Sequence, residues 1–277
     1  MSGAIKNIVK QLIGYFTKKF NGPHVESLIV QTENGLFSVA QDDLTVGWKL
    51  RRNGQYGSEE LQWLKSYLTP ESRVLVVGAH IGSLAIPVSK ICKEVVAVEA
   101  NPDTFKLLSQ NILLNQATNC TAINIAASDK TETISFLLNK VNSGGSKRTP
   151  IHKKDMYYYD RPAEIKIQAY SLDEYFPKRD FDMIIMDIEG SEYFALKGMQ
   201  RILSNSQVLA VEFLPHHLKN VSGVTAEEFV NVVQSHFTTL SIPSEKRLVT
   251  SSDILSTLSD MYKRNHEEDL VLFLKTR

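Results

Sequence analysis

The sequence predicts an α/β protein whose mostly parallel sheet is covered by helices on both faces. From residue 73 onward, short apolar segments rich in β-branched residues alternate with segments of helical character. This alternation is typical of parallel strands joined by crossover helices. The first strand ends in a glycine-bearing turn, and the second ends in an acidic residue roughly twenty positions later, as in nucleoside-binding βαβ units.

The part of the chain before residue 58 predicts a small appendage. Apolar residues recur at helical spacing over residues 1–20, which indicates an amphipathic helix. Residues 25–50 have β character, and Glu33-Asn34-Gly35 lies between two apolar runs, as in a hairpin turn. Residues 51–57 are expected to form a polar loop that leads into the main domain.

The main domain is predicted to span residues 58–277, and residues 1–57 are predicted to form the appendage. The expected strands are residues 73–77, 94–99, 120–125, 181–187, 207–213, 237–242 and 270–274, with an extra hairpin from 134–138 and 165–169. The expected helices are residues 59–68, 82–92, 103–115, a segment after 192, 225–236 and 251–264. A polar stretch over residues 139–162 interrupts this regular pattern.

The glycines of the first turn discriminate between ligands. A dinucleotide fingerprint needs three glycines, because the diphosphate must approach the backbone at a helix N-terminus. Here the pattern is Gly78-x-x-x-Gly82, with His80 near the place of the middle glycine. Such a turn favours a cofactor without phosphates, and S-adenosylmethionine is one. The carboxylate of Glu99, at the end of the second strand, can accept hydrogen bonds from both hydroxyls of a ribose.

Charge and cysteine content exclude several classes of protein. The 277 residues include 31 basic and 31 acidic side chains, so the formal net charge is zero. This balance disfavours nucleic acid as a partner, because proteins that bind it carry a basic surface. Cys92 and Cys120 are isolated in the sequence and are expected to be reduced core residues. The sequence has no membrane span or signal-peptide pattern, which predicts a cytoplasmic protein.

The predicted helix within residues 1–20 allows several roles. Its only charged side chains are lysines, so it can lie on an anionic membrane surface as a peripheral anchor. Its apolar stripe can equally pack on the main domain or mediate self-association, which makes a homodimer a further expectation.

Acidic residues follow most of the predicted parallel strands. Glu99, Asp129, Asp187 and Glu212 stand at or just beyond strand ends. Because the carboxyl ends of parallel strands meet at one edge of the sheet, these side chains predict a ligand site there. Purely structural roles stay open, since Asp129 could cap a turn, and Asp187 with Glu189 could cap the helix that begins near residue 191.

Four stretches carry a resemblance to a known family. They are Val74–Gly82, Val98–Pro102, Ile125–Asp129 and Met186–Glu192, with Gly144-Gly145-Ser146 as a further small-residue element. Together they resemble the FkbM-type family of S-adenosylmethionine-dependent methyltransferases, and the run at residues 186–192 is the most specific of them. The resemblance implies a Rossmann-like class I methyltransferase fold with a seven-stranded sheet whose last strand is antiparallel.

The resemblance also implies that S-adenosyl-L-methionine is the cofactor. The residues implied to bind it are Gly78, Ala79, His80, Ile81, Gly82, Glu99, Ala100, Asn101, Ala127, Ser128, Asp129 and Asp187. Two positions depart from the family pattern. Val76 stands where the family usually has an acidic residue that helps to orient the amino-acid end of the cofactor, so that contact is changed or weakened. His80 replaces the usual Asn, and it either substitutes as a donor or faces the substrate.

Methyl transfer to a hydroxyl needs an aligned acceptor and a base for the acceptor proton. The candidates for the catalytic base, near the fourth and fifth strand ends, are Asp187, Glu189, His216 and His217. Histidine suits a hydroxyl acceptor because it titrates near neutral pH. Asp187, Glu189 and Glu212 could instead hold a hard divalent cation. The resemblance does not require a metal, and no metal ligand is assigned.

The resemblance implies O-methylation of a hydroxyl on a glycan or on a polyketide or peptide-derived metabolite. The segment Lys147–Tyr159 combines basic and aromatic residues, so it forms either a substrate lid or a solvated loop. Two other functions stay open. An NAD-dependent oxidoreductase would share Glu99 but would need the absent third glycine. A non-catalytic nucleoside-binding scaffold is favoured by Val76 alone.

Overall fold

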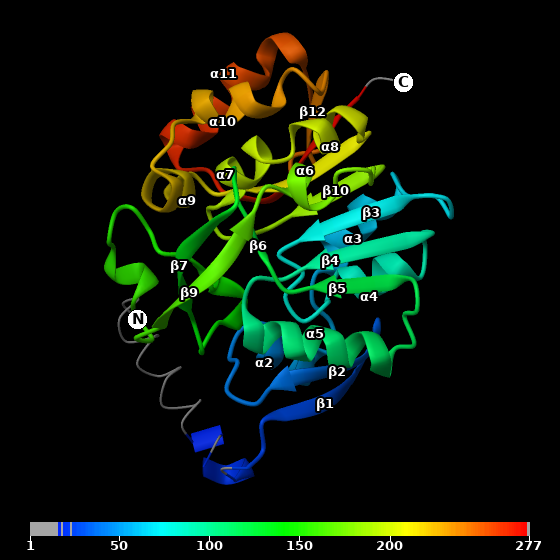
Figure 1. Cartoon of the computed structure of the whole chain (residues 1–277), viewed down its shortest axis with the longest axis vertical. Helices are drawn as coiled ribbons and strands as arrows, with labels where there is room; N and C mark the ends of the chain where they lie inside the picture. Colours follow the sequence, from blue (N-terminus) through cyan, green and yellow to red (C-terminus); the bar gives the residue numbers. More distant parts are fainter. Residues whose placement is uncertain (1–15, 18, 23, 276–277) are drawn as a thin grey trace.

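A central eight-stranded sheet organises the structure, a computed structural model that describes residues 16–17, 19–22 and 24–275. Figure 1 shows the arrangement of its elements. The strand order is β13 (Arg247–Thr250), β12 (Thr239–Ile242), β14 (Glu268–Leu274), β11 (Val208–Phe213), β10 (Met183–Met186), β3 (Arg73–Val77), β4 (Glu94–Val98) and β5 (Cys120–Ile123). The helix predicted for residues 1–20 lies largely outside the described residues, so its membrane and self-association roles stay predictions.

Seven of these strands form the predicted sheet, and β13 is an addition. The strands β11, β10, β3, β4 and β5 are parallel, and β14 runs antiparallel between β11 and β12. The prediction of seven strands was therefore short by one. β13 pairs antiparallel with β12 across the turn Pro243–Lys246. The sequence did not predict β13, because this strand is four residues long and mostly exposed. It therefore lacks the alternating apolar pattern by which a strand is recognised.

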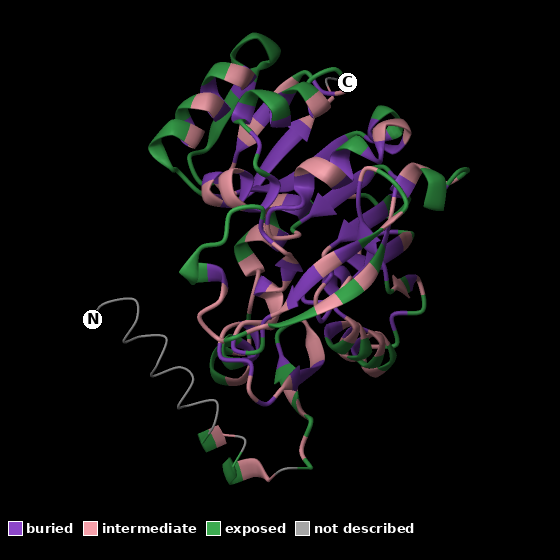
Figure 2. Cartoon of the chain, turned by 60° about the vertical axis from the view of Figure 1, so that its left-hand side comes forward, coloured by how far each residue is buried: buried purple, intermediate pink, exposed green. Residues whose placement is uncertain are grey.

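Helices cover both faces of the sheet, as predicted. One face carries α3 (Ser58–Lys65), α4 (Ala85–Ser89) and α5 (Pro102–Leu114), and the other carries α6 (Leu172–Tyr175), α7 (Glu192–Lys197), α8 (Gln200–Asn205), α10 (Ala226–Val233) and α11 (Ser251–Arg264). Along β3, Val74 and Val76 join the core of the first face, while Leu75 and Val77 join that of the second. The central strands β3, β4, β10 and β11 are accordingly buried along nearly their whole length (Figure 2). This explains their continuous apolar sequences.

The appendage packs against α5. Its hairpin, β1 (Ser27–Thr32) and β2 (Gly35–Ala40), confirms the predicted hairpin, with Glu33-Asn34 as the turn and Gly35 paired to Thr32. Asn111 of α5 and Asn115, which follows α5, hydrogen-bond to the backbone of β2. The next segment corrects the prediction, because α2 (Val46–Asn53) is a helix where β-structure and a polar loop were expected. Val46 and Leu50 are buried one helical turn apart, and Gly54 ends the helix in a left-handed conformation.

A smaller sheet stands beside the carboxyl edge of the main sheet. It consists of β6 (Ala126–Ala127), β9 (Ala163–Tyr170), β7 (Glu132–Leu138) and β8 (Lys147–Arg148). The pairing of β7 with β9 confirms the predicted extra hairpin. The polar stretch between them contains β8 and two short helical turns, η1 (Ser143–Gly145) and η2 (Asp155–Tyr157). After β11 the chain turns through α9 (Pro215–His217) and the π-helical turn η3 (Leu218–Ser222).

Candidate active site

The ends of β3, β4 and β10 are locked together at the carboxyl edge of the sheet. The backbone N–H groups of Gly78 and Ala79 both donate to the carbonyl of Val98 at 2.9 Å. Gly78 has φ +85°, and a Cβ there would lie 1.7 Å from the carbonyl oxygen of Asp187. Only glycine fits this position, because the first turn passes directly against the backbone that follows β10.

Glu99 is held rigidly at the end of β4. Its carboxylate accepts the backbone N–H of His80 at 2.7 Å and that of Asn101 at 2.8 Å. Burial raises the pKa of Glu99 to about 7, although these backbone hydrogen bonds oppose the shift. Each carboxylate oxygen has further acceptor capacity beyond these bonds. Glu99 lines the cleft described next, so that capacity is available to a ligand.

A deep cleft opens above these strand ends and encloses about 1150 Å³ of space, including its mouth. Its apolar part is lined by Ile125, Ala126, Ala127, Ile134 and Phe136, and its polar part includes Glu99, Asp187 and Glu189. Among the described residues that line it, none is Lys or Arg. Three carboxylates with no lysine or arginine beside them in the lining suit a cationic ligand and oppose a diphosphate. An apolar wall beside Glu99 suits a nucleoside base.

The appendage and the polar stretch also form walls of this cleft. Thr45, Val46 and Tyr56 line it from the appendage, and Asn142, Ser143, Gly144 and Ser146 line it from the polar stretch. These contributions were not assigned from the sequence. The small residues at 144–146 were the only signal for them.

His80 ties these walls to the first turn. Its Nε2 lies 2.7 Å from Ser143 Oγ, and that hydroxyl donates to Asp43. Burial lowers the pKa of His80, so the ring is neutral and its Nε2–H donates to Ser143. The serine lies between the histidine and the aspartate, so this trio does not activate a nucleophile. His80 also has a positive φ of 50°, a strained conformation that the surrounding contacts maintain.

A second cavity adjoins the cleft. It is lined by Asn139, Asn142, Gly145, Lys147, Met156, Tyr157, Tyr159, Glu189 and His217, and it encloses about 380 Å³ including its mouth. Asn142 and Glu189 line both spaces, so they mark the junction between them. Glu189 adopts a positive φ of 57°, which for a non-glycine residue is strained. The turn after β10 thus presents this carboxylate to both spaces.

Lys147 brings a buried positive charge to the second cavity. Its ammonium donates to Glu189 Oε2 at 2.7 Å and to His217 Nε2 at 3.3 Å. It also lies 5.1 Å from the centre of the Tyr157 ring. The side chain of Lys147 is only 6% exposed. The sequence named this residue only as part of the segment Lys147–Tyr159, because its partners lie far away along the chain.

His217 is neutral and oriented by its neighbours. Burial and the nearby charge of Lys147 lower its pKa far below the usual range. Because its Nε2 accepts from Lys147, the ring proton is assigned to Nδ1, which lies 3.5 Å from Glu212 Oε2. A histidine with its Nε2 occupied in this way is a poor proton acceptor in the described state.

Three carboxylates lie close together next to Lys147 and His217. Oxygens of Asp187, Glu189 and Glu212 lie within 4.8 Å of one another. Burial raises the pKa of Asp187 and of Glu212 well above the usual range, and the neighbouring carboxylates add to both shifts. The exposed surface of Asp187 faces the cleft that it lines. The set has oxygen ligands that a hard divalent cation would accept, and Lys147 supplies a positive charge beside Glu189.

Some predicted site residues lie outside the lining of both spaces. Ile81 is buried in the core against the appendage, and Gly82 packs against Ile86, where a Cβ would lie 2.9 Å away. Asn101 caps α5 by accepting the backbone N–H groups of the first turn. These residues build the turn and helix that carry Ala79, His80, Glu99 and Ala100, all of which line the cleft.

Three further predicted residues point elsewhere. Ser128 donates to Glu132 at 2.7 Å, and Asp129 pairs with Lys197 at 3.5 Å. Of the three residues Ala127, Ser128 and Asp129, Ala127 is the one that lines the cleft. His216 Nδ1 lies 2.9 Å from Glu267 and lines neither space. The structure therefore brings Asp187, Glu189 and His217 together but not His216.

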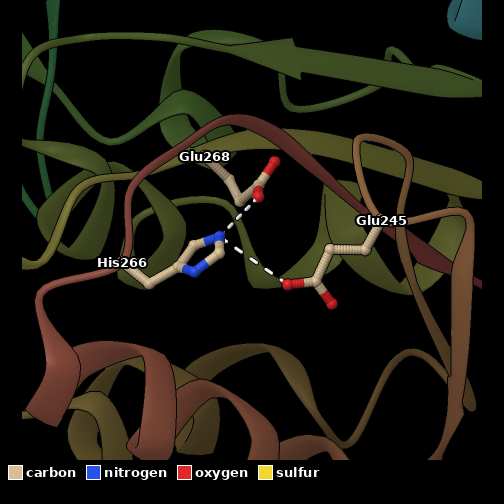
Figure 3. Close-up of side chains that lie close together, drawn as sticks. All are labelled: Glu245, His266 and Glu268. Atoms are coloured by element: carbon tan, nitrogen blue, oxygen red, sulfur yellow. Dashed lines mark hydrogen bonds and ion pairs between the residues drawn. The ribbon is translucent and has the colours of Figure 1, made fainter.

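A second cluster with metal-ligand chemistry lies away from these spaces. His266 Nε2 lies 2.8 Å from Glu268 and 3.7 Å from Glu245 (Figure 3). Ser244 also donates to Glu268 at 2.7 Å. These contacts join the β12–β13 turn to the start of β14, so a structural role accounts for them.

Comparison with known proteins identifies the family. The model for the methyltransferase FkbM domain matches residues 77–245. The chain belongs to the FkbM methyltransferase family. The cofactor expected from the sequence, S-adenosylmethionine, accords with this membership. No curated protein matches the chain.

Solved structures that resemble this FkbM-family protein are distant in sequence. An FkbM methyltransferase from Methylobacillus flagellatus KT is 18% identical with a TM-score of 0.40, and the match covers 74% of this chain and 44% of that one. An rRNA methylase from Streptococcus thermophilus is 15% identical with a TM-score of 0.44, over 79% and 95% of the two chains. TYW2 from M. jannaschii, solved in complex with AdoMet, is 16% identical with a TM-score of 0.40, over 68% and 62%.

The chain thus spans less than half of the length of that FkbM methyltransferase. Its fold is the Rossmann-like fold of class I methyltransferases, with one strand added at the edge of the sheet. In the part of the chain that the structure describes, no helix combines the length and apolarity needed to cross a bilayer.

Proposed function

We propose that this FkbM-family protein transfers a methyl group from S-adenosylmethionine to a hydroxyl of a glycan or of a natural-product or peptide-derived metabolite. One observation carries the proposal. A cleft whose described lining holds three carboxylates and no lysine or arginine meets a second, smaller cavity at Glu189. This arrangement provides separate places for a cationic nucleoside and for an acceptor, with a carboxylate between them.

The cleft has groups suited to each part of the cofactor. Glu99 accepts the ribose hydroxyls, and the apolar wall that includes Ala127 and Phe136 contacts the adenine. Asp187 binds the ammonium of the amino-acid end. Its carboxylate lines the cleft, whereas Val76, at the position where the family usually has an acidic residue, provides no carboxylate there. When bound, S-adenosylmethionine supplies a methyl group on a positively charged sulfur that departs as a neutral thioether.

Glu189 is the proposed base for the acceptor hydroxyl. It alone among the predicted catalytic residues lines both the cleft and the second cavity. His217 lines only the second cavity, and its Nε2 is engaged by Lys147. A proton acceptor must lie within hydrogen-bond reach of the proton that it removes, which favours the residue at the junction.

The alternatives are less well supported. An NAD-dependent oxidoreductase needs a glycine-rich turn that brings backbone N–H donors to a diphosphate, and the first turn, Gly78 to Gly82, lacks the third glycine. A non-catalytic scaffold would not need a second cavity beside the cofactor. We further propose that the protein acts in the cytoplasm on an acceptor other than nucleic acid, in keeping with its reduced cysteines and zero net charge.

Calorimetry and a transfer assay test the proposal. S-adenosylmethionine should bind with one site per chain, while NAD should give no heat of binding. Incubation with methyl-tritiated S-adenosylmethionine and a panel of methyl glycosides, phenols and peptide metabolites should then label an acceptor. Binding of NAD in place of S-adenosylmethionine would refute the proposal. Cofactor binding without labelling of any acceptor would favour the scaffold.

A further inference from the structure

Residues from distant parts of the chain enclose the second cavity. Lys147 comes from β8, Met156 and Tyr157 come from η2, Glu189 comes from the turn after β10, and His217 ends α9. Asn142 and Glu189 separate this space from the cofactor cleft. We infer that the second cavity is the acceptor site, an inference that rests on the proposed function.

The walls of the cavity indicate the kind of acceptor that fits it. Tyr157 and Tyr159 both line it, and burial raises the pKa of each hydroxyl to about 12. Both rings are therefore neutral at physiological pH and offer flat apolar faces with a hydroxyl at the edge. Asn139 and Asn142 add amide groups to the same lining. Such walls suit a single ring that bears hydroxyl groups.

Lys147 is the cation on this lining. Lysine is almost never fully buried unless it is paired. Among the residues that the structure describes, Lys147 forms an ion pair with one carboxylate, that of Glu189. Its ammonium has three donors, and the structure gives it two hydrogen bonds, to Glu189 and to His217. One donor is left for a third acceptor within a cavity that Lys147 lines.

We propose that Lys147 is a catalytic residue that contacts the acceptor oxygen and stabilises its developing negative charge. In this step the hydroxyl proton passes to Glu189, and the acceptor oxygen forms a bond to the methyl carbon. The bond between that carbon and the sulfur breaks, and its electron pair stays on sulfur. When Glu189 takes the proton, its carboxylate loses its negative charge. The ammonium of Lys147 then pairs with the negative charge that develops on the acceptor oxygen.

His217 has a positioning role in this account. Its Nε2 accepts one hydrogen of the ammonium, and its Nδ1 faces Glu212. The neutral ring therefore fixes the direction of the Lys147 donors without adding a charge. The strained backbone at Glu189 fixes the other partner. Both ends of the contact are thus held in place before an acceptor arrives.

A phenol with a coloured anion tests this role without knowledge of the natural acceptor. The protein is treated with EDTA and saturated with S-adenosylhomocysteine, whose binding is checked by calorimetry. 4-Nitrophenol is then titrated with pH, and the absorbance of its bound anion is followed. The compared chains are wild type, Lys147→Met, Lys147→Arg and, as a control in the same polar stretch, the exposed Lys153→Met.

A nearby ammonium favours the ionised phenol, so wild type should lower the pKa of bound 4-nitrophenol by about one unit or more. Lys153→Met should preserve this shift, Lys147→Arg should preserve part of it, and Lys147→Met should abolish it. An equal shift in Lys147→Met and wild type would overturn the proposal. So would a shift that appears only after MgCl₂ is added, because a metal would then supply the charge.

The wild-type titration alone decides the outcome if Lys147→Met does not fold. The role assigned to Lys147 is overturned if bound 4-nitrophenol has the same pKa as it has in solution. It is also overturned if 4-nitrophenol does not bind at all. Failure of S-adenosylhomocysteine to bind wild type would instead refute the proposed function, so the two failures are distinguishable.

Discussion

Replacement of Glu99 by glutamine should weaken binding of S-adenosylmethionine. The carboxylate holds two backbone N–H groups and keeps acceptor capacity for the ribose. Glutamine keeps the shape but replaces one oxygen by a donor, so one hydrogen bond to a charged acceptor is lost. Such bonds contribute about 1.5–3 kcal/mol, which corresponds to a loss of about 10- to 150-fold in affinity.

The pH dependence of the same equilibrium supplies a second magnitude. Because burial raises the pKa of Glu99 to about 7, a large part of the population is protonated at pH 6. A ligand that needs the carboxylate should bind about tenfold more weakly at pH 6 than at pH 8. Asp187, whose pKa is also raised, adds to the trend in the same direction. The Glu99→Gln variant should therefore show a shallower dependence on pH.

Calorimetry at pH 6, 7 and 8 in buffers of different ionisation enthalpy measures both the affinity and the protons released. Glu94→Gln is the matched control, because Glu94 begins the same strand but pairs with Arg179. The control should bind as wild type does. An affinity of Glu99→Gln within threefold of wild type, with an unchanged pH profile, would refute this reasoning.

Three further predictions concern turnover, folding and pH. His217→Ala should slow single-turnover methyl transfer by about 100-fold through loss of alignment, with the cofactor Kd unchanged, whereas His216→Ala should have little effect; equal losses would contradict this. Gly78→Ala should lower the urea midpoint far more than Gly54→Ala, which meets open space and should cost about 1 kcal/mol. Burial raises the pKa of Glu192 to about 7, so the folded state binds the extra proton and stability should fall as pH rises from 5 to 8. Glu192→Gln should remove up to about 3 kcal/mol of that fall in urea unfolding, and an unchanged slope would contradict the assignment.

The parts of the fold that follow from local pattern were predictable. The strands ending near Gly78 and Glu99 have continuous apolar sequences because both faces of the sheet are covered. The segment Glu33-Asn34-Gly35 indicated the first hairpin, although the turn itself is Glu33-Asn34. By contrast, α2 has only Val46 and Leu50 as buried hydrophobic residues. They pack with the preceding hairpin and with Ile81 and Ile86, which come from the first turn and α4. A sequence pattern this weak does not reveal which residues will pack against the helix.

The cofactor cleft and the second cavity also differ in how far the sequence predicts them. Glu99 and Asp187 follow strands, so the sheet itself predicts where they meet. Lys147 contacts Glu189 and His217 from 42 and 70 residues away in the sequence. Its place depends on how the polar stretch crosses the edge of the sheet, and no periodic signal encodes that path. The residues of the proposed acceptor site therefore became visible only with the structure.

A crystal structure with S-adenosylhomocysteine tests the central claim most directly. The account predicts the ribose hydroxyls within hydrogen-bond distance of Glu99, and the sulfur at the junction marked by Glu189. A nucleoside bound elsewhere, or a sulfur that faces away from the second cavity, would contradict it.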